Sequence, residues 1–399
     1  MRLLKSCLGD RRRVAEAQDG PVVVLLMNAF GMGGATRSVF GVSAQLALSR
    51  PVEIVSVFRK KVDPSFPFPS GVALSVLDDR KSRRPLVARA LSKIPSILMH
   101  PDDGAYGWFT LWTDLLLLRR LRAVRSGFVL TSRPAVSVLA ALVVRPEVTL
   151  VIQEHTHLGA LAGDLPRAVE QAYRGSDAVA LLTDRDRAQY EALLRGSIAK
   201  VVAIPNAVPA LSGQPLPAPE RRRVVIAAGR LTEQKGFDLL LEAFHRVAPS
   251  HPDWRLEIYG RGLLQDELAA RLQALGLTAV ASLAGTTQEL GEFLASSAVF
   301  ALSSRYEGLP QVVLEAMSKA TAIVAFDCPT GPRELIQDGD NGLLVPAEDV
   351  EAFAAALTRV LDDVDLRAEL GRHALDTVGL YAPEVIGARW RSLFDELVA

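Results

Sequence analysis

The chain has 399 residues, more than a single hydrophobic core usually supports, so we expect two domains. Hydrophobic residues make up 49% of it and charged residues 23%, a globular composition that excludes a largely disordered protein. The two cysteines, Cys7 and Cys328, lie far apart and form no metal-binding pattern, which favours a reducing compartment over a disulfide framework.

The net charge is zero for the whole chain, but its two halves have opposite signs. Residues 1–208 contain 28 Lys and Arg against 18 Asp and Glu, a charge of +10, and residues 209–399 contain 17 against 27, a charge of −10. This asymmetry predicts an anionic partner for the first half, unless it serves solubility alone. No run reaches the ~18 apolar residues that span a bilayer, and the first twenty residues do not resemble a signal peptide, so we expect a cytoplasmic protein.

The first domain is predicted over residues 21–208, after a leader at residues 1–20. Apolar strands alternate with helical segments there, which is typical of a parallel sheet. The expected strands are 21–27, 52–57, 128–131, 148–154, 178–182 and 201–204, and the expected helices are 36–49, 111–124, 165–174 and 184–194. Residues 60–108 show no regular pattern.

Five prolines fall within residues 205–219, so residues 209–222 are predicted as a linker. A second α/β domain is predicted over residues 223–380, and a final helical segment over 381–399. The expected strands are 223–228, 255–259, 280–284, 298–302 and 322–326, and the expected helices are 237–247, 263–275, 287–296, 311–319, 349–362, 364–379 and 382–398. The fold class is therefore α/β with two Rossmann-like domains.

Two carboxylates, Glu307 and Glu315, lie eight residues apart across an expected strand-to-helix junction. Pro310 suits the first position of the helix, which would place Glu307 in the loop and Glu315 in the helix. Carboxylates at the two ends of such a loop can accept hydrogen bonds from the hydroxyl groups of an extended sugar ligand. The alternative is a surface helix with two solvated glutamates.

Two cations, Arg230 and Lys235, follow the expected strand at residues 224–228. Ligands of open α/β sheets bind at the carboxyl ends of the strands, where this pair could neutralise a diphosphate. The alternative is a solvated basic loop.

Both patterns resemble the signatures of the retaining family 4 glycosyltransferases, E-x7-E and G-R-x4-K-G, in the same order. The resemblance extends to residues 258–262, 327–334 and 341–346, and more loosely to 31–37, 153–157 and 204–207. It implies the GT-B fold, in which two Rossmann-like domains face a cleft and a final helix, here starting near Pro383, crosses back to the first domain.

The resemblance also implies an activity: transfer of a hexosyl group, with retention, from a nucleoside diphosphate sugar, with UDP as the favoured nucleotide. Glu315 would hold the ribose hydroxyls, Arg230 and Lys235 the leaving diphosphate, and Glu307 with the backbone of Gly308, Leu309 and Pro310 the donor sugar. Two further glycines, Gly229 and Gly260, are assigned to donor binding. No residue in this set is an evident nucleophile, which agrees with the front-face displacement proposed for the family.

In the first half, Gly31, Gly33 and Gly34 separate a strand from a helix, as a phosphate-binding turn requires, although the full dinucleotide motif is absent. In the resembled family this loop approaches the donor diphosphate and the acceptor, so the resemblance implies that position for Gly33 and Gly34, unless the turn is purely structural. His155 and His157 follow an apolar strand, and relatives carry a histidine there near the donor sugar. We therefore assign His155 to the site, with a structural histidine as the alternative.

No metal is expected. The Asp-x-Asp triplets at residues 184–186, 338–340 and 363–365 are interpreted as solvated, and the two histidines are too few for zinc. No cofactor is bound; the nucleotide sugar is a substrate.

Residues 80–93 combine six cations with Leu and Val at helical spacing. They are either an ordinary helix packed on the core or a contact with anionic lipid. The expected partners are the nucleotide sugar, a carbohydrate or lipid-linked acceptor and an anionic membrane surface on the inner face of the cell membrane, without nucleic acid. The rival functions are a GT-B epimerase or phosphorylase and a catalytically silent nucleotide-sugar-binding protein.

Overall fold

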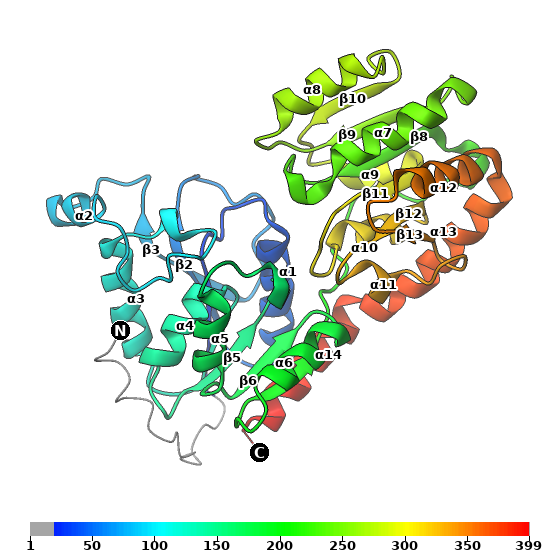
Figure 1. Ribbon diagram of the computed structural model, residues 1–399. Coiled ribbons are helices and arrows are strands. Elements are labelled where there is room, and N and C mark those ends of the chain that lie inside the picture. The colour runs from blue at the N-terminus through cyan, green and yellow to red at the C-terminus, as the bar shows by residue number, and fades with distance from the viewer. Residues whose placement is uncertain (1–19, 399) are drawn as a thin grey trace. The chain divides into compact units, whose positions relative to one another are not determined.

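A computed structural model describes residues 20–398, so the expected leader lies almost entirely outside the described residues (Figure 1). The chain divides into two compact units. The first contains the chain up to Ala207 together with the segment from Pro383 onward, and the second runs from Val208 to Ala382.

The first unit is built on a parallel sheet of seven strands in the order β3-β2-β1-β4-β5-β6-β7. Its strands are β1 (Val22–Leu26), β2 (Val52–Arg59), β3 (Val72–Asp79), β4 (Phe128–Thr131), β5 (Thr149–Gln153), β6 (Ala178–Leu181) and β7 (Lys200–Ala203). Its helices are α1 (Gly34–Leu46), α2 (Leu86–Leu91), α3 (Leu111–Ala123), α4 (Pro134–Val143), α5 (Leu165–Tyr173), α6 (Asp184–Leu193) and α14 (Pro383–Glu396).

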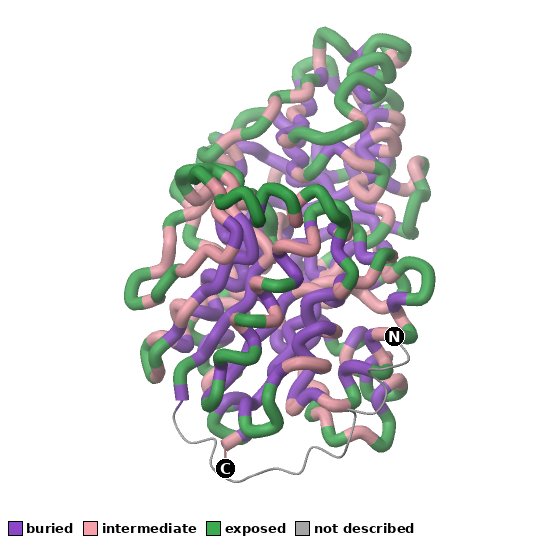
Figure 2. The backbone as a smooth tube through the Cα atoms, turned by 90° about the vertical axis from the view of Figure 1, so that its left-hand side faces the viewer, coloured by how far each residue is buried: buried purple, intermediate pink, exposed green. Residues whose placement is uncertain are grey.

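Both faces of this sheet are covered, which explains why β1 is a continuous apolar run rather than an alternating one. Val23 and Leu25 point into a core shared with α3, α4, α5 and α6. Val22 and Val24 point into a second core that contains α1 and α14. Figure 2 shows the strands as buried purple segments, with the exposed green segments mainly in loops and on outer helices.

The second unit has a parallel sheet of six strands in the order β10-β9-β8-β11-β12-β13. Its strands are β8 (Arg222–Ala228), β9 (Arg255–Tyr259), β10 (Ala281–Gly285), β11 (Ser297–Leu302), β12 (Ala322–Asp327) and β13 (Leu343–Pro346). Its helices are α7 (Phe237–Val247), α8 (Gln265–Ala274), α9 (Leu290–Ser296), α10 (Gln311–Met317), α11 (Pro332–Leu335), α12 (Val350–Asp362) and α13 (Val364–Val378).

The expected α/β class and the two Rossmann-like sheets are confirmed. Five elements are additional, one of them the six-residue helix α2 within residues 60–108. The edge strand β3 has a weak alternation, α4 is apolar on nearly all sides and lacks a helical period, and α11 and β13 have only four residues each.

The proline-rich residues 209–222 are held against the second unit rather than free between two units. The Arg221 guanidinium donates to the carbonyl groups of Leu216, Ser297 and Lys319. The Lys319 ammonium in turn donates to the carbonyl groups of Leu211 and Gly213. Proline lacks a backbone donor, so the carbonyl groups of this segment are satisfied by two buried cations instead of a sheet ladder.

Candidate functional site

The strand order of the second unit creates a switch point between β8 and β11. After β8 the chain builds β9 and β10 on one side of the sheet, and then returns to place β11 on the other side of β8. The loops that follow β8 and β11 therefore diverge at the carboxyl edge, which is where open α/β sheets bind their ligands. These are the loops that carry Arg230, Lys235 and Glu307.

Two glycines allow these loops to touch one another. Gly236 has a φ of 57°, and a Cβ on it would overlap the carbonyl oxygen of Ser303 in the loop after β11. Gly260, with a φ of 153°, lies against the carbonyl group of Gly229 in the same way. Glycine is required at both positions because side-chain atoms would push the loops apart.

Lys235 and Glu307 form a largely buried ion pair, although they are 72 residues apart. The Lys235 Nζ lies 2.5 Å from the Glu307 Oε1, and the two side chains are 15% and 7% exposed. The Ser304 hydroxyl donates to the same carboxylate oxygen at 2.6 Å, and the Ser303 hydroxyl donates to the Lys235 carbonyl at 3.0 Å. The sequence assigned this cation and this carboxylate to different parts of the ligand, whereas the structure joins them directly.

Arg230 is exposed and forms no ion pair within the described residues. Its guanidinium donates to the Gln234 side chain at 3.3 Å, and the Gln234 amide donates to the carbonyl of Tyr306 at 3.1 Å. Arg230 is thus linked to the loop after β11 while its charge faces solvent. Arg261, which sequence analysis gave no role, is a second exposed cation at the carboxyl end of β9, next to Gly260.

Glu315 lies in the second turn of α10 and is 5% exposed, so the alternative of two solvated glutamates is wrong for both positions. Pro310 is the residue before the helix rather than its first residue. The backbone N–H groups of Gly308 and Leu309 donate no hydrogen bond within the described residues. Free N–H groups at the start of a helix can bind an oxygen-rich or anionic ligand.

In the first unit, Gly33 and Gly34 lie at the N-terminus of α1, beside the switch point between β1 and β4. Gly33 has an extended conformation with no side-chain cap, and the first turn contains no acidic residue. The first turn of α1 therefore contributes no carboxylate of its own to the positive end of the helix.

His155 follows β5, and its position is fixed by the preceding residue. Glu154 is buried, and its Oε1 accepts from the backbone N–H groups of His155 (2.9 Å) and Thr156 (3.0 Å), while its Oε2 accepts from the Tyr173 hydroxyl (2.8 Å). Burial raises the pKa of Glu154 to about 7, against the opposing effect of these hydrogen bonds.

The imidazole of His155 is neutral at pH 7. Burial lowers its pKa to about 4, and its Nε2 is inaccessible to solvent and has no hydrogen-bond partner within the described residues. A buried polar atom without a partner is costly in a purely structural histidine, which favours a ligand-contacting role. His157, in contrast, accepts from the N–H of Gly159 at 3.1 Å and serves a local turn.

The Asp-x-Asp triplets support the local backbone, and one expectation about them is wrong. Asp186 is buried rather than solvated, because it exchanges hydrogen bonds with Thr183 at the N-terminus of α6. Asp338 accepts from the N–H of Leu344, and Asp363 caps α13. Within residues 20–398 no group of three or more His, Cys, Asp or Glu side chains is arranged to hold a metal.

Cys328 is buried at the end of β12, and burial raises the pKa of its thiol to about 12. A protonated, buried thiol is not a nucleophile at neutral pH.

The structure brings most of the predicted site residues of the second unit together at the carboxyl ends of three strands. They are Gly229, Arg230, Lys235, Gly260, Glu307, Gly308, Leu309 and Pro310, with Glu315 in the helix that follows. The other three, Gly33, Gly34 and His155, lie at the carboxyl ends of β1 and β5 in the first unit. Sequence analysis missed Ser303, Ser304 and Arg261, which stand inside or beside the segments it identified.

Known proteins are similar to this chain in sequence. Residues 212–376 match the glycosyl transferases group 1 family. The chain is 32% identical over 379 residues to an exopolysaccharide phosphotransferase of Streptomyces coelicolor, an alignment that covers 92% of this chain and 40% of that protein. It is also 36% identical over 171 residues to the amylovoran biosynthesis glycosyltransferase AmsD of Erwinia amylovora, covering 43% of this chain and 48% of that one. The alignments thus span about half the length of these relatives or less.

Solved structures share the fold over nearly the whole chain. The TarM structure of Staphylococcus aureus with UDP has a TM-score of 0.74 at 16% identity, and covers 94% of this chain and 99% of that one. A sucrose-phosphate synthase of Thermosynechococcus elongatus has a TM-score of 0.72 at 18% identity, with 94% and 98% covered.

Proposed function

We propose that the protein transfers a hexosyl group, with retention, from a nucleoside diphosphate sugar to an acceptor hydroxyl, and the match of residues 212–376 to the glycosyl transferases group 1 family supports this. The observation that carries this proposal is the switch point of the second unit. There the paired Lys235 and Glu307, the exposed Arg230 and the free N–H groups of Gly308 and Leu309 meet at one sheet edge.

The proposed roles are those that the family resemblance implies, and the charges of the side chains are compatible with them. Arg230 and Lys235 neutralise the departing diphosphate, Glu315 binds the ribose hydroxyls, and Glu307 with the Gly308–Pro310 backbone binds the donor sugar. The acceptor oxygen bonds to the anomeric carbon as the bond to the diphosphate breaks. The acceptor proton passes to a diphosphate oxygen, so no enzymic nucleophile is needed. Charge placement and proximity then supply the catalysis, and no metal takes part.

The acceptor belongs to envelope or exopolysaccharide synthesis, and the reaction takes place on the cytoplasmic side of the membrane. The proposed class of acceptor is supported by the relatives named for exopolysaccharide and amylovoran synthesis. None of the described helices is long and apolar enough to cross a bilayer.

The Streptomyces relative is named for phosphate transfer, which makes sugar-phosphate transfer the second candidate. The two reactions break different bonds. Glycosyl transfer releases the nucleoside diphosphate. Sugar-phosphate transfer instead joins the acceptor oxygen to the phosphorus atom next to the sugar, breaks the P–O bond of the phosphoanhydride, and releases the nucleoside monophosphate.

The test is product analysis with the purified full chain, UDP-hexoses labelled in the sugar and in the uracil, and carbohydrate or lipid-linked acceptors. We expect UDP and a product that keeps the anomeric configuration of the donor, with the rate unchanged in excess EDTA. Release of UMP would establish sugar-phosphate transfer. Donor binding without turnover would indicate a silent binding protein, and free epimerised sugar nucleotide an epimerase. With inorganic phosphate added, sugar 1-phosphate released from a glycosidic bond of the carbohydrate would indicate a phosphorylase.

A further inference from the structure

A 22-residue segment of the first unit contains no acidic residue. Residues 80–101 carry six cations and no Asp or Glu. They are Arg80, Lys81, Arg83, Arg84, Arg89 and Lys93. This segment includes α2 and lies at an edge of the first unit, beyond β3 (Figure 1).

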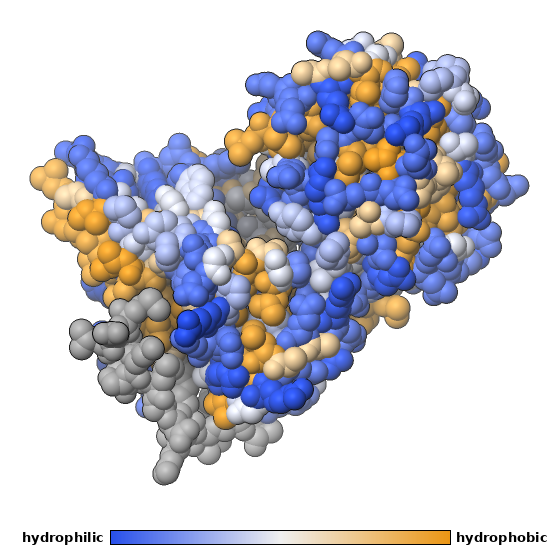
Figure 3. Space-filling view, viewed as in Figure 1, coloured by the Kyte–Doolittle hydropathy of each residue, from blue (hydrophilic) through white to orange (hydrophobic). Residues whose placement is uncertain are grey.

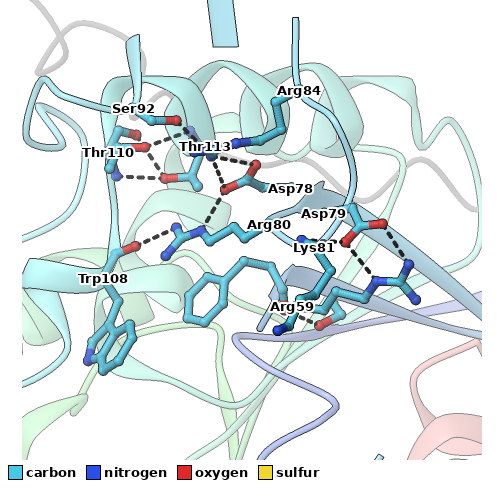
Figure 4. Close-up of polar contacts among 12 residues, drawn as sticks. Arg59, Asp78, Asp79, Arg80, Lys81, Arg84, Ser92, Trp108, Thr110 and Thr113 are labelled. Atoms are coloured by element: carbon cyan, nitrogen blue, oxygen red, sulfur yellow. Dashed lines mark hydrogen bonds and ion pairs between the residues drawn. The ribbon is translucent and has the colours of Figure 1, made fainter. Parts of the chain in front are cut away.

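Two of the six cations are used to hold the segment in place. Arg80 and Arg84 both bind the carboxylate of Asp78, whose side chain is 1% exposed, and Arg84 also donates to the Ser92 hydroxyl at 3.0 Å (Figure 4). The other four, Lys81, Arg83, Arg89 and Lys93, are exposed and form no ion pair within residues 20–398. Their charge is directed to solvent, with no carboxylate paired to it in the part of the chain that the structure describes.

Aliphatic side chains are exposed among these free cations. Leu86 and Val87, in the first turn of α2, are 79% and 62% exposed, and Ile97 is 73% exposed. Figure 3 shows a hydrophobic area at the left edge of the first unit, where Figure 1 places α2 and α3. A soluble protein rarely groups exposed aliphatic residues in this way without a partner.

The backbone that presents these side chains is firmly held. Asp114 of α3 is buried and accepts from the Ser96 hydroxyl and from the N–H groups of Ile97 and Leu98 at 2.7–3.2 Å. Ile94 accepts from the N–H of Leu111, and Pro95 pairs with Thr110. The exposed positions are therefore built into the fold.

We infer that this basic apolar surface, residues Lys81–Ile97, binds the headgroup region of an anionic lipid bilayer. Aliphatic side chains that insert at the boundary of the acyl chains, surrounded by cations that attract anionic headgroups, are the two features of interfacial binding. The alternative of an ordinary helix packed on the core is wrong for Leu86 and Val87, which face solvent. A polyanionic polysaccharide accounts for the cations but not for the aliphatic residues. The inference does not depend on the proposed transfer reaction.

The test is co-sedimentation of the full chain with vesicles of phosphatidylcholine alone or mixed with phosphatidylglycerol. We expect binding to the anionic vesicles that weakens steeply as the salt concentration rises from 0.05 to 0.5 M. Over this range the screening length falls from roughly 14 to roughly 4 Å. The double variant Leu86→Ser, Val87→Ser and the triple variant Arg83→Gln, Arg89→Gln, Lys93→Gln should each lower the partition coefficient at least tenfold.

Matched controls test whether vesicle binding depends on this surface or on the total exposed hydrophobicity and charge of the protein. Leu263→Ser removes an aliphatic side chain that is 95% exposed in the second unit, and Arg167→Gln, Arg195→Gln, Arg359→Gln removes three exposed charges elsewhere. Both controls should bind vesicles as the wild type does. All substituted positions are exposed, and unchanged circular dichroism and UDP affinity verify the fold.

Equal binding to neutral and anionic vesicles, or controls that lose as much binding as the surface variants, would overturn the inference. Normal vesicle binding by the double variant Leu86→Ser, Val87→Ser would also overturn it, because the cations would then act alone. If dextran sulfate binds the wild type but does not release the protein from vesicles, the inference that the surface binds lipid is supported. If the protein binds dextran sulfate but not anionic vesicles, the partner is a soluble polyanion.

Discussion

At the scale of single residues, the ion pair between Lys235 and Glu307 decides how substitutions in the donor site should be interpreted. Both side chains are almost completely buried, so removal of either one leaves an uncompensated charge in the interior. Arg230 is exposed and has no such structural role. Loss of activity in a Lys235 variant therefore combines the loss of a ligand contact with a loss of stability. Loss of activity in an Arg230 variant reflects the ligand contact alone.

We predict that Arg230→Ala lowers turnover by about tenfold to a hundredfold without a change in stability, since a charge-assisted hydrogen bond contributes roughly 1.5–3 kcal/mol. Lys235→Ala should lower turnover similarly and also the free energy of unfolding by roughly 3 kcal/mol. The double variant Lys235→Met, Glu307→Gln should recover most of the stability but none of the turnover.

The measurements are initial rates and urea unfolding, with Arg223→Ala as the control. Arg223 lies at the start of β8, at the opposite edge of the sheet, and pairs with Asp253. Near-normal turnover in both single variants, or an active double variant, would contradict the assignment of the two cations to the leaving group.

Glu154 should make the stability of the first unit depend on pH. Its pKa is about 7 in the folded protein against 4.5 ordinarily, so the folded state binds the proton more tightly. The contribution to stability is complete below pH 4.5 and is lost as the pH rises through 7, a change of roughly 3 kcal/mol. The neighbouring His155, with its pKa lowered to about 4, acts in the opposite direction, losing stability as the pH falls from 6.5 to 4.

We therefore predict that the unfolding free energy of the wild type minus that of Glu154→Gln decreases by roughly 3 kcal/mol as the pH rises from 4.5 to 8. The difference removes the contribution of His155, which is common to both proteins. Urea unfolding monitored at four pH values measures it. A constant difference would show that Glu154 is ionised throughout, and the position of its carboxylate would need another explanation.

At the scale of elements, the loops at the carboxyl edge of the second sheet act as one layer. Gly236 allows the loop after β8 to contact the loop after β11, and Gly260 allows the loop after β9 to contact Gly229. Arg230 and Lys235 are positioned by these backbone contacts, in addition to their own side-chain interactions.

We predict that Gly260→Ala lowers the affinity for UDP at least about tenfold, because the new Cβ displaces Gly229 and hence Arg230. Gly276→Ala is the matched control: Gly276 also has a positive φ of 66°, but no atom lies within 4 Å of the added Cβ. The control carries only the conformational strain, roughly 1 kcal/mol. Calorimetric titration with UDP measures both variants, and equal affinities would show that the contact between the loops is unimportant.

At the scale of the whole molecule, the end of the chain completes the core formed by its beginning. Helix α14 follows the second unit in sequence but belongs to the first, where Ile386, Trp390, Leu393 and Phe394 are buried against β1 and α1. The ring of Phe394 lies 4.6 Å from that of Phe128 in β4.

We predict that Trp390→Ala destabilises the first unit by roughly 3–5 kcal/mol through the cavity that it leaves. The affinity of the second unit for UDP should remain unchanged. Arg389→Ala, at an exposed position of the same helix, is the control. Urea unfolding and UDP titration check both statements, and a stable Trp390→Ala variant would mean that α14 is not part of this core.

The sequence alone determined the α/β class, the order of nearly all strands and helices, and the segments that carry the site. This was possible because buried parallel strands such as β1 are continuous apolar runs, and because Gly229–Gly236 and Glu307–Glu315 are local patterns of loop and helix start. Such features depend on neighbours along the chain. The sequence did not determine β3, α2, α4, α11 and β13, which are short or lack a period.

Only the tertiary structure decided what the site residues contact. The pairing of Lys235 with Glu307, the contact of Gly260 with Gly229 and the fixing of His155 by Glu154 and Tyr173 join positions whose separation in sequence carries no signal. The structure also separated the anchored Arg80 and Arg84 from the free Arg83 and Arg89, although all four look alike in sequence. Burial and hydrogen bonding arise from the strand order of the sheets, and that order brings distant residues to the same edge.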